Sequence, residues 1–389
     1  MKFLIIAPHF WPENGVATQR ISSFSRYLLN NNHQVSVITN KKGSKVVYKK
    51  LENYFEVDGC DLTRSSYKVF KYNQNLYRYE LERVLNMERY DVVLFTGGPF
   101  FTFSLTKECK EKNIFCLLDF RDPWSFDYRG LKDVVSIKRI AKRMVFALLE
   151  RRAIKHANAV TTVTQGWVDR FKRSYLCQKE KFFLIENGYD DDRLRNICLS
   201  NEFRKNHGVL TLGVFGKLFY YSDYYSKVFL NAIKIFCDSS DSNVKMLQVG
   251  DKESVCDELI MNANLDLDIL ECTGLLSYED GIAAIAGTDI CLIIDSRKKA
   301  LGTKLYDYIF LGKTIIYVGP RKSAFSEVLK QYGKAYICST VKEVVCALDS
   351  FSKANDGGNE DRNIYKDKFS RSYSNKKWLT LIEELVEKR

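Results

Sequence analysis

The feature that most constrains this chain is a repeated alternation of short apolar runs with longer segments of helical periodicity. We expect strands at 2–7, 34–39, 91–96, 114–120, 159–164 and 182–186, with helical patterns between them. A second series follows, with expected strands at 210–215, 245–249, 268–273, 290–294, 314–318 and 335–338. Strands that are apolar throughout and separated by helices are typical of a parallel sheet buried on both faces. The sequence therefore predicts an α/β fold with two doubly wound sheets.

The alternation breaks once, in a polar stretch at 190–208 that we interpret as a linker. We expect Rossmann-like domains at 1–189 and 209–355, and a helical tail at 356–389 that packs back toward the N-terminal domain. Residues 41–73 fit neither pattern, and we interpret them as a variable excursion. A chain of 389 residues is long enough for two such domains. The carboxyl ends of their strands would face a cleft between them.

Cysteine and histidine spacing argues against disulfides and metals. The chain has 11 cysteines without a C-x-x-C pair, and its 4 histidines show no metal-ligand spacing. The apolar start ends at Pro8, too soon for a signal peptide, and no apolar run approaches the roughly 18 residues that span a bilayer. We therefore expect a cytoplasmic protein with reduced thiols and no bound metal.

The net charge of +12, from 60 Lys and Arg against 48 Asp and Glu, favours an anionic partner. Within 137–155, apolar residues at helical spacing alternate with basic ones: Lys138, Arg139, Lys142, Arg143, Arg151, Arg152 and Lys155. Such a helix can lie on an anionic membrane surface. It can equally be a solvated face over a stripe that packs inward. Because no aromatic stacking platform accompanies it, we do not expect nucleic-acid binding.

Three loops after expected strands carry residues suited to an anionic ligand. Asn14-Gly15 stands at a helix entrance, and Lys217 follows the first strand of the second series. Gly302-Thr303 opens a helix on which Lys304 and Asp307 share one face. Each has an ordinary explanation, a turn or a surface ion pair. All three belong on the cleft side, and this coincidence favours a ligand site.

In content and order these segments resemble a GT-B glycosyltransferase of the large retaining family 4, especially its bacterial O-antigen and capsule branch. The resemblance covers nearly the whole chain. It rests on stretches at 10–15, 119–124, 157–160, 186–190, 249–251, 273–274, 302–308 and 312–313, together with Glu150 and Thr164.

The resemblance implies two domains facing across a cleft, with a nucleotide-sugar donor, expected to be a UDP-sugar, held mainly by the second. It assigns the donor to Asn14, Gly15, Lys217, Val249, Gly250, Gly274, Leu275, Gly302, Thr303, Lys304 and Asp307. In this assignment the lysines neutralise the diphosphate and Asp307 binds the ribose hydroxyls. On the first domain it implies catalytic roles for Asp119 and Asp122, and an acceptor side formed by Glu13, Arg121 and Trp124.

The chain departs from the family pattern at three places. Lys299 stands where the first glutamate of the family's pair belongs, and Asp307 replaces the second. The second basic residue expected shortly after Lys217 is missing, and residues 220–223 read Tyr-Tyr-Ser-Asp. The family's active-site histidine has no clear counterpart.

The resemblance thus implies a metal-independent hexosyltransferase without a cofactor, peripheral on the inner face of the cell membrane. It would pass a sugar, with retention, to a lipid-linked saccharide in surface-polysaccharide synthesis. Lysines and backbone amides would stabilise the departing diphosphate. Two alternatives stay open. One is a GT-B-fold sugar-nucleotide epimerase, which needs acid/base groups. The other is a non-catalytic nucleotide-sugar-binding partner of a transferase.

Overall fold

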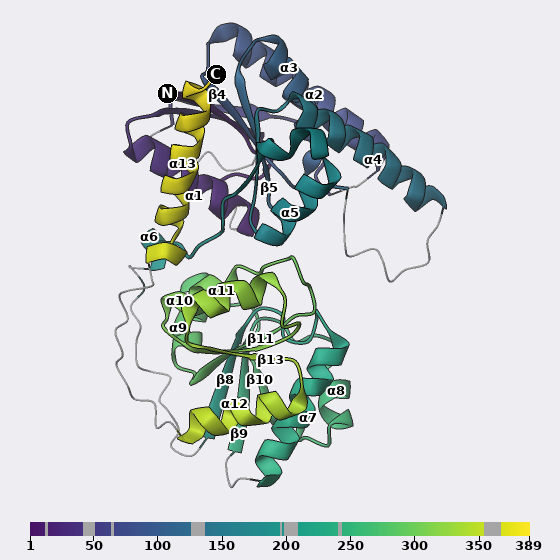
Figure 1. Cartoon of the computed structure of the whole chain (residues 1–389), viewed down its shortest axis with the longest axis vertical. Helices are drawn as coiled ribbons and strands as arrows, with labels where there is room; N and C mark the ends of the chain where they lie inside the picture. Colours follow the sequence, from purple (N-terminus) through teal and green to yellow (C-terminus); the bar gives the residue numbers. More distant parts are fainter. Residues whose placement is uncertain are drawn as a thin grey trace. The chain divides into compact units, whose positions relative to one another are not determined.

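The computed structural model describes residues 1–11, 15–41, 51–63, 66–125, 137–194, 197, 209–239, 243–353 and 367–389. The chain forms two compact units (Figure 1): unit 1 is Met1–Asn187 with Arg371–Arg389, and unit 2 is Gly188–Ser370. The expected linker at 190–208 begins with a short helix, α6 (Asp191–Leu194), that belongs to unit 2. Most of the remaining linker lies outside the described residues.

Unit 1 is built on a parallel sheet of seven strands in the order β3-β2-β1-β4-β5-β6-β7. Successive side chains point to opposite faces, so Phe3 and Ile5 join one core while Leu4 and Ile6 join the other. The strands are β1 (Lys2–Ile6), β2 (Gln34–Asn40), β3 (Asn53–Val57), β4 (Val92–Thr96), β5 (Phe115–Phe120), β6 (Ala159–Thr162) and β7 (Phe182–Leu184).

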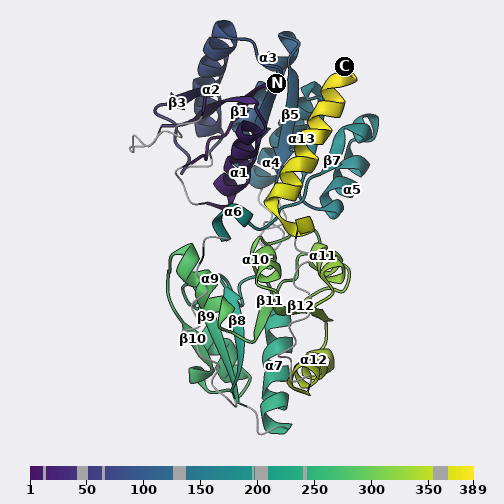
Figure 2. The same ribbon diagram turned by 90° about the vertical axis from the view of Figure 1, so that its left-hand side faces the viewer.

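Helices cover both faces of this sheet (Figures 1 and 2). One face carries α1 (Val16–Asn30) and the C-terminal helix α13 (Arg371–Glu387), which pack against each other. The other face carries α2 (Tyr67–Met87), the 3-10 helix η1 (Phe100–Leu105), α3 (Thr106–Glu111), α4 (Ile137–His156) and α5 (Gln165–Ser174). The 3-10 helix η3 (Leu176–Lys181) leads into β7.

Unit 2 repeats the design with six parallel strands in the order β10-β9-β8-β11-β12-β13. The strands are β8 (Val209–Phe215), β9 (Asn243–Val249), β10 (Leu270–Cys272), β11 (Ile290–Ile294), β12 (Thr314–Val318) and β13 (Ala335–Cys338). One face carries α7 (Asp223–Ser239), α8 (Cys256–Asn262) and α12 (Val341–Lys353), and the other α9 (Tyr278–Ala286), α10 (Lys304–Phe310) and α11 (Ala324–Tyr332). Short 3-10 helices are η4 (Leu267–Ile269) and η5 (Asp367–Phe369).

Each sheet reverses its strand order at one point, beside β1 in unit 1 and beside β8 in unit 2. At such a switch point the loops that follow the two central strands diverge toward opposite faces and leave room for a ligand at the carboxyl ends. In unit 2 these are the β8–α7 loop and the β11–α10 loop. The fold thereby selects one edge of unit 2 as a place for a ligand.

The predicted α/β class with two doubly wound parallel sheets is confirmed, and every expected strand is present. The interpretation of 41–73 as an excursion is wrong for two parts of that range. It contains β3, and α2 begins at Tyr67 rather than near residue 74. β3 is an edge strand with only Val57 fully buried, so it lacks the apolar run that marks the central strands.

Candidate functional site

The switch point of unit 2 brings together the loops of two predicted cations. Lys217 follows β8, and Lys304 begins α10 after the neighbouring strand β11. The Lys304 ammonium donates a hydrogen bond to the backbone carbonyl of Lys217 at 2.9 Å. The Lys217 side chain itself is exposed. The two lysines assigned to a diphosphate therefore lie on adjoining loops of one sheet edge.

Charged groups surround the Lys304 ammonium. Burial lowers the pKa of Lys304 to about 8, the carboxylates of Asp295 and Glu253 oppose that change, and the Arg297 guanidinium adds to it. A desolvated ammonium gives up its proton more easily than one in water, and a neighbouring anion reverses this effect. The position is therefore suited to a bound anion.

Three glycines at this edge have backbone conformations that residues with side chains rarely adopt. Gly216, Gly250 and Gly274 have φ of 79°, 143° and 71°. The Gly216 amide donates to the Val249 carbonyl at 2.7 Å, and Gly250 forms an antiparallel bridge with Gly274. The structure thus joins the predicted base-flanking residues Val249, Gly250 and Gly274. Leu275, the next predicted residue, is 85% exposed.

A buried polar network beneath this edge was missed by sequence reasoning. Gln248 Nε2 lies 3.0 Å from each of three acceptors, the carbonyls of Gly216 and Asp251 and the Glu253 carboxylate, which share its two hydrogens. Glu253 also accepts the Leu218 amide at 2.7 Å. The network holds the β8–α7 loop against the end of β9. The available signal was Gln248, a polar residue at the end of an apolar strand.

Asp307 and Lys304 have different partners although they lie on the same helix. The Tyr278 hydroxyl donates to Asp307 Oδ1 at 2.7 Å, and the Tyr278 ring centre lies 4.2 Å from Arg193 Cζ. Asp307 is buried, so it is not part of an exposed surface ion pair. Gly302 and Thr303, the other predicted residues here, are half-buried just before α10.

The unit 1 residues assigned to the donor and acceptor fall at the start of α1 and after β5. Glu13 and Asn14 lie outside the described residues. Gly15 is exposed at the N-cap of α1, and its carbonyl accepts the Gln19 amide at 3.0 Å. Asp122 is exposed, which leaves its carboxylate accessible to a ligand.

Asp119, predicted as catalytic, is completely buried. Its two oxygens accept hydrogen bonds from Arg20 at 3.0 and 3.1 Å, and Thr161 donates to it at 2.9 Å. Arg20 also donates to the carbonyls of Ile185 and Glu186, at the exit of β7. This geometry favours a structural role for Asp119, which orients Arg20 so that it can bind the backbone carbonyls after β7.

Arg121 and Trp124, predicted on the acceptor side, make contacts within unit 1. The Arg121 guanidinium donates to the carbonyls of Gly97 and Gly98, and burial lowers its pKa. Trp124 is 8% exposed and stacks on Phe100 at 5.6 Å and on Phe70 at 5.8 Å between ring centres. These contacts favour a core role for Trp124, because its ring is buried among other aromatic rings.

The basic segment at 137–155 has two interpretations, a helix on a membrane surface and a helix whose apolar stripe packs inward. The structure of α4 decides between them only in part. Its C-terminal turns are packed, with Ala153 and Ile154 in the core. Its middle is open to solvent, and the exposed fractions of Ile140, Met144 and Leu148 are 45%, 65% and 59%. These apolar side chains therefore do not form an inward-packing stripe. No helix within the described residues is long and apolar enough to cross a membrane.

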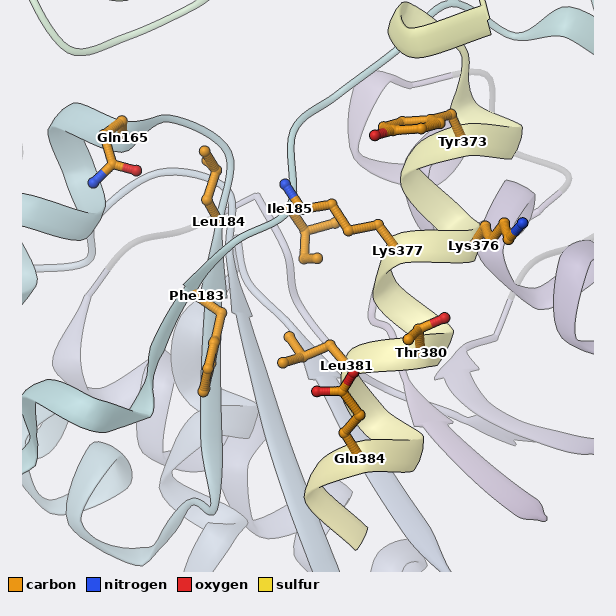
Figure 3. Close-up of a pocket in the computed structure, with 10 residues that line it drawn as sticks. All are labelled: Gln165, Phe183, Leu184, Ile185, Tyr373, Lys376, Lys377, Thr380, Leu381 and Glu384. Atoms are coloured by element: carbon orange, nitrogen blue, oxygen red, sulfur yellow. The ribbon is translucent and has the colours of Figure 1, made fainter. Parts of the chain in front are cut away.

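A separate hollow of about 700 Å³ lies in unit 1 between the edge strand β7 and α13 (Figure 3). Phe183, Leu184 and Leu381 give it apolar walls, while Lys376 and Glu384 are polar lining residues. Its lining includes none of the predicted site residues. The hollow is therefore distinct from the site that the sequence predicts.

Comparison with known proteins adds to this geometry. Residues 15–193, a little under half of the chain, match the family model Glycosyltransferase Family 4. No curated protein matches the sequence significantly. Among solved structures the chain is similar to WaaG, a glycosyltransferase involved in lipopolysaccharide biosynthesis, with a TM-score of 0.68 and 14% identity over 98% of this chain and 99% of that one.

Two further structures show how widely this fold is shared. The lipopolysaccharide outer core galactosyltransferase WaaB matches with a TM-score of 0.65 and 12% identity over 99% of each chain. The UDP-GlcNAc 2-epimerase from Methanocaldococcus jannaschii matches with a TM-score of 0.60 and 12% identity over 99% of this chain and 100% of that one. Likeness at such identities shows the fold alone. The chain therefore has the GT-B fold, and its residues 15–193 match the model of glycosyltransferase family 4.

Proposed function

We propose that this protein transfers a hexose, with retention, from a nucleoside-diphosphate donor to a lipid-linked saccharide in the synthesis of an O-antigen or capsule. The observation that carries the donor half is the meeting of the Lys217 and Lys304 loops at the switch point of unit 2. The family match of residues 15–193 supports the reaction class. A UDP-sugar is the expected donor.

The chemistry of transfer requires positive charge where the leaving diphosphate becomes more negative. Groups fixed in advance stabilise that charge without rearranging during the reaction. The Lys304 ammonium, held on the Lys217 carbonyl, and the exposed Lys217 side chain provide such charge. In this proposal the lysines do the work that a divalent metal does in other transferases, so transfer is metal-independent.

The remaining donor contacts follow from the same edge. The buried Asp307 carboxylate accepts ribose hydroxyls beside Tyr278, and the backbone around Gly250 and Gly274 flanks the base. Leu275, which is 85% exposed, gives the base an apolar neighbour. Gly302 and Thr303 bring the backbone close to the diphosphate.

Unit 1 supplies the acceptor and sugar side. We assign contact with the transferred sugar to the exposed Asp122, together with Glu13, Asn14 and Gly15. Arg121 acts through the backbone that it holds at Gly97 and Gly98. Asp119 and Trp124 are buried, and in this proposal they stabilise the loop after β5 that carries Asp122.

The acceptor is proposed to be lipid-linked because α4 combines exposed apolar and exposed basic side chains. Met144 and Leu148 are solvent-exposed beside Lys142 and Arg143. Apolar side chains can enter a bilayer interface while neighbouring cations meet anionic headgroups. In this proposal the protein acts on the inner face of the cell membrane, in the cytoplasm.

The second candidate is a sugar-nucleotide epimerase, favoured by the fold shared with UDP-GlcNAc 2-epimerases. The two activities are separated by incubating the purified protein with a panel of nucleotide sugars, with and without a lipid-linked saccharide fraction. Transfer releases nucleoside diphosphate only when acceptor is present, and it labels the lipid fraction. Conversion of the donor sugar without acceptor would establish the epimerase. Binding of a nucleotide sugar without turnover in either arm would indicate a non-catalytic partner.

A further inference from the structure

We propose that Arg297 is a second cation of the diphosphate site and replaces the basic residue that the β8–α7 loop lacks. The inference rests on the proposed donor site. The first observation is that residues 220–223, shortly after Lys217, include no basic side chain. A diphosphate with two charged groups is bound more firmly by several cations than by one.

The fold places Arg297 beside that deficient stretch. Arg297 follows β11, the strand next to β8 at the switch point. Its Cζ atom lies 3.9 Å from the ring centre of Tyr221, in the β8–α7 loop. Ser296 connects the β11–α10 loop to the β8–α7 loop, because its hydroxyl donates a hydrogen bond to the Tyr221 carbonyl at 2.8 Å. A cation from the β11–α10 loop therefore lies over Tyr221, in the segment of the β8–α7 loop that has no basic residue.

The guanidinium is held in a fixed orientation. Asp295 is 1% exposed, and it accepts the Arg297 backbone amide at 2.9 Å and the Nε and Nη2 groups of the side chain. A guanidinium stays charged at every physiological pH. The Arg297 side chain retains 21% of its exposure, so part of it faces solvent at this edge.

Arg297 is also near the other cation of the site. The Arg297 charge contributes to the lowered pKa of Lys304, as expected for two like charges that interact. Placing two cations together costs free energy in the empty protein, and an anion between them offsets this cost. Asp295 and Glu253 offset part of this cost in the protein itself, and a bound anion at the switch point would offset it further.

The competing explanation is that Arg297 only neutralises the buried Asp295. Three variants separate the two roles. Arg297→Gln removes the cation, and Asp295→Asn/Arg297→Gln removes it without leaving a buried carboxylate unpaired. Arg297→Lys keeps the charge but loses the paired geometry on Asp295. Lys245→Gln is the matched control, because Lys245 forms an exposed ion pair with Asp268 toward the amino end of β9.

Titration calorimetry of the full-length protein with UDP, GDP, CDP, ADP and dTDP first identifies the preferred base, and the variants are then titrated with that diphosphate and with its nucleoside. Arg297→Gln and the double variant should raise the Kd for the diphosphate by roughly tenfold or more and leave nucleoside binding unchanged. Arg297→Lys should lose less than Arg297→Gln, and Lys245→Gln should lose nothing.

The inference is overturned if the double variant binds the diphosphate as tightly as wild type, or if Arg297→Lys and Arg297→Gln lose affinity equally. Either result, with wild type binding a diphosphate, leaves the proposed donor site standing. If wild type binds none of the five diphosphates, the proposed function falls and takes this inference with it.

Discussion

At the scale of single residues, partners distant in sequence decide the chemistry of the site. Sequence spacing places Lys304 and Asp307 on one helix face, and the structure keeps both at the predicted edge. Sequence spacing could not show that Lys304 binds a carbonyl 87 residues away or that Asp307 binds Tyr278. Asp119 illustrates the same limit, since its partner Arg20 lies 99 residues earlier. Local spacing identifies candidate side chains, whereas their electrostatic environment follows from strand order.

The environment of Lys304 predicts a pH dependence of donor binding. With the pKa lowered to about 8, the free site loses its ammonium above that pH. Because a bound diphosphate favours the ammonium, affinity should fall as pH rises through 8, and binding near pH 8 should take up a proton. Titrations in two buffers of different ionisation enthalpy measure this uptake.

Lys304→Ala should abolish that proton uptake and cost about 1.5–3 kcal/mol of diphosphate binding, with little effect on the nucleoside. Lys217→Ala should weaken diphosphate binding as well, but it should keep the pH dependence because Lys304 remains. Unchanged diphosphate affinity in both variants would remove the lysines from the donor site.

The pairing of Asp307 with Tyr278 predicts a graded loss of ribose recognition. Asp307→Asn should weaken binding of the ribonucleotide and barely change that of its 2′,3′-dideoxy analogue. Tyr278→Phe removes the hydrogen bond that orients the carboxylate, so it should cost about 1 kcal/mol for the ribonucleotide only. Calorimetry with both nucleotides measures the difference. Equal losses for the two nucleotides would make Asp307 a structural residue.

Asp119 and Asp122 should separate into a structural and a functional carboxylate. Asp119→Ala leaves Arg20 as an uncompensated buried charge, so the free energy of unfolding should fall by about 3–5 kcal/mol. Asp122→Ala changes an exposed side chain and should alter stability by less than about 0.5 kcal/mol while reducing transfer. Denaturant unfolding and a transfer assay test the pair. A stable but inactive Asp119→Ala protein would instead support the predicted catalytic role.

At the scale of elements, the sequence predicts what is buried on both faces and misses what is not. The central strands β1, β4, β5, β11 and β12 are buried apart from Lys2, and their sequences are mostly apolar. The edge strand β3 has only one buried residue, so its pattern carried no signal. The helix predicted at 137–155 exists as α4, but periodicity alone could not tell whether its apolar side chains meet the core or solvent.

Helix α13 is predicted to hold unit 1 together from the far end of the chain. Trp378 is fully buried, stacks on Phe24 of α1 at 4.3 Å and lies against Arg20, with Cζ 4.6 Å from its ring centre. Trp378→Ala should therefore lower the free energy of unfolding of unit 1 by about 3–5 kcal/mol. Tyr373→Ala, on the exposed face of the same helix, should change it by less than about 0.5 kcal/mol.

Urea unfolding of the full-length protein, followed by circular dichroism, compares the two variants with wild type. Similar stability for Trp378→Ala and Tyr373→Ala would show that α13 is dispensable for unit 1. The comparison also bears on the Arg20–Asp119 pair, because Trp378 covers the arginine.

At the scale of the whole molecule, the chain crosses between its units in two adjacent segments. The Tyr189 amide donates to the Phe369 carbonyl at 3.0 Å, and Tyr189 pairs with Ser370 in a parallel bridge. A Cβ atom on Gly188 would lie 2.5 Å from the Ser370 backbone, so only glycine permits this approach. The excursion into unit 2 thus begins and ends at one point. Unit 1 is completed only after unit 2 has been traversed.

The distribution of charge over the whole molecule leads to the last prediction, that α4 docks the protein on anionic membrane. Reversing Lys138, Arg139, Lys142 and Arg143 to Glu together should release the protein from vesicles rich in anionic lipid, since each cation contributes about 1 kcal/mol near such a surface. The matched control reverses four exposed lysines of unit 2, Lys322, Lys330, Lys342 and Lys353, and so changes the net charge of +12 by the same amount. If docking depends on α4 rather than on net charge, the control should stay bound.

Met144→Ser/Leu148→Ser should weaken binding without changing charge, because both side chains are exposed and apolar. Co-sedimentation with anionic and neutral vesicles at low and high salt measures each variant, and wild type should lose anionic vesicles as salt screens the attraction. Equal release of the α4 variant and the unit 2 control, or wild type that ignores anionic vesicles at low salt, would contradict docking through α4. The acceptor would then no longer be expected to be lipid-linked, while nucleotide binding in unit 2 would be unaffected.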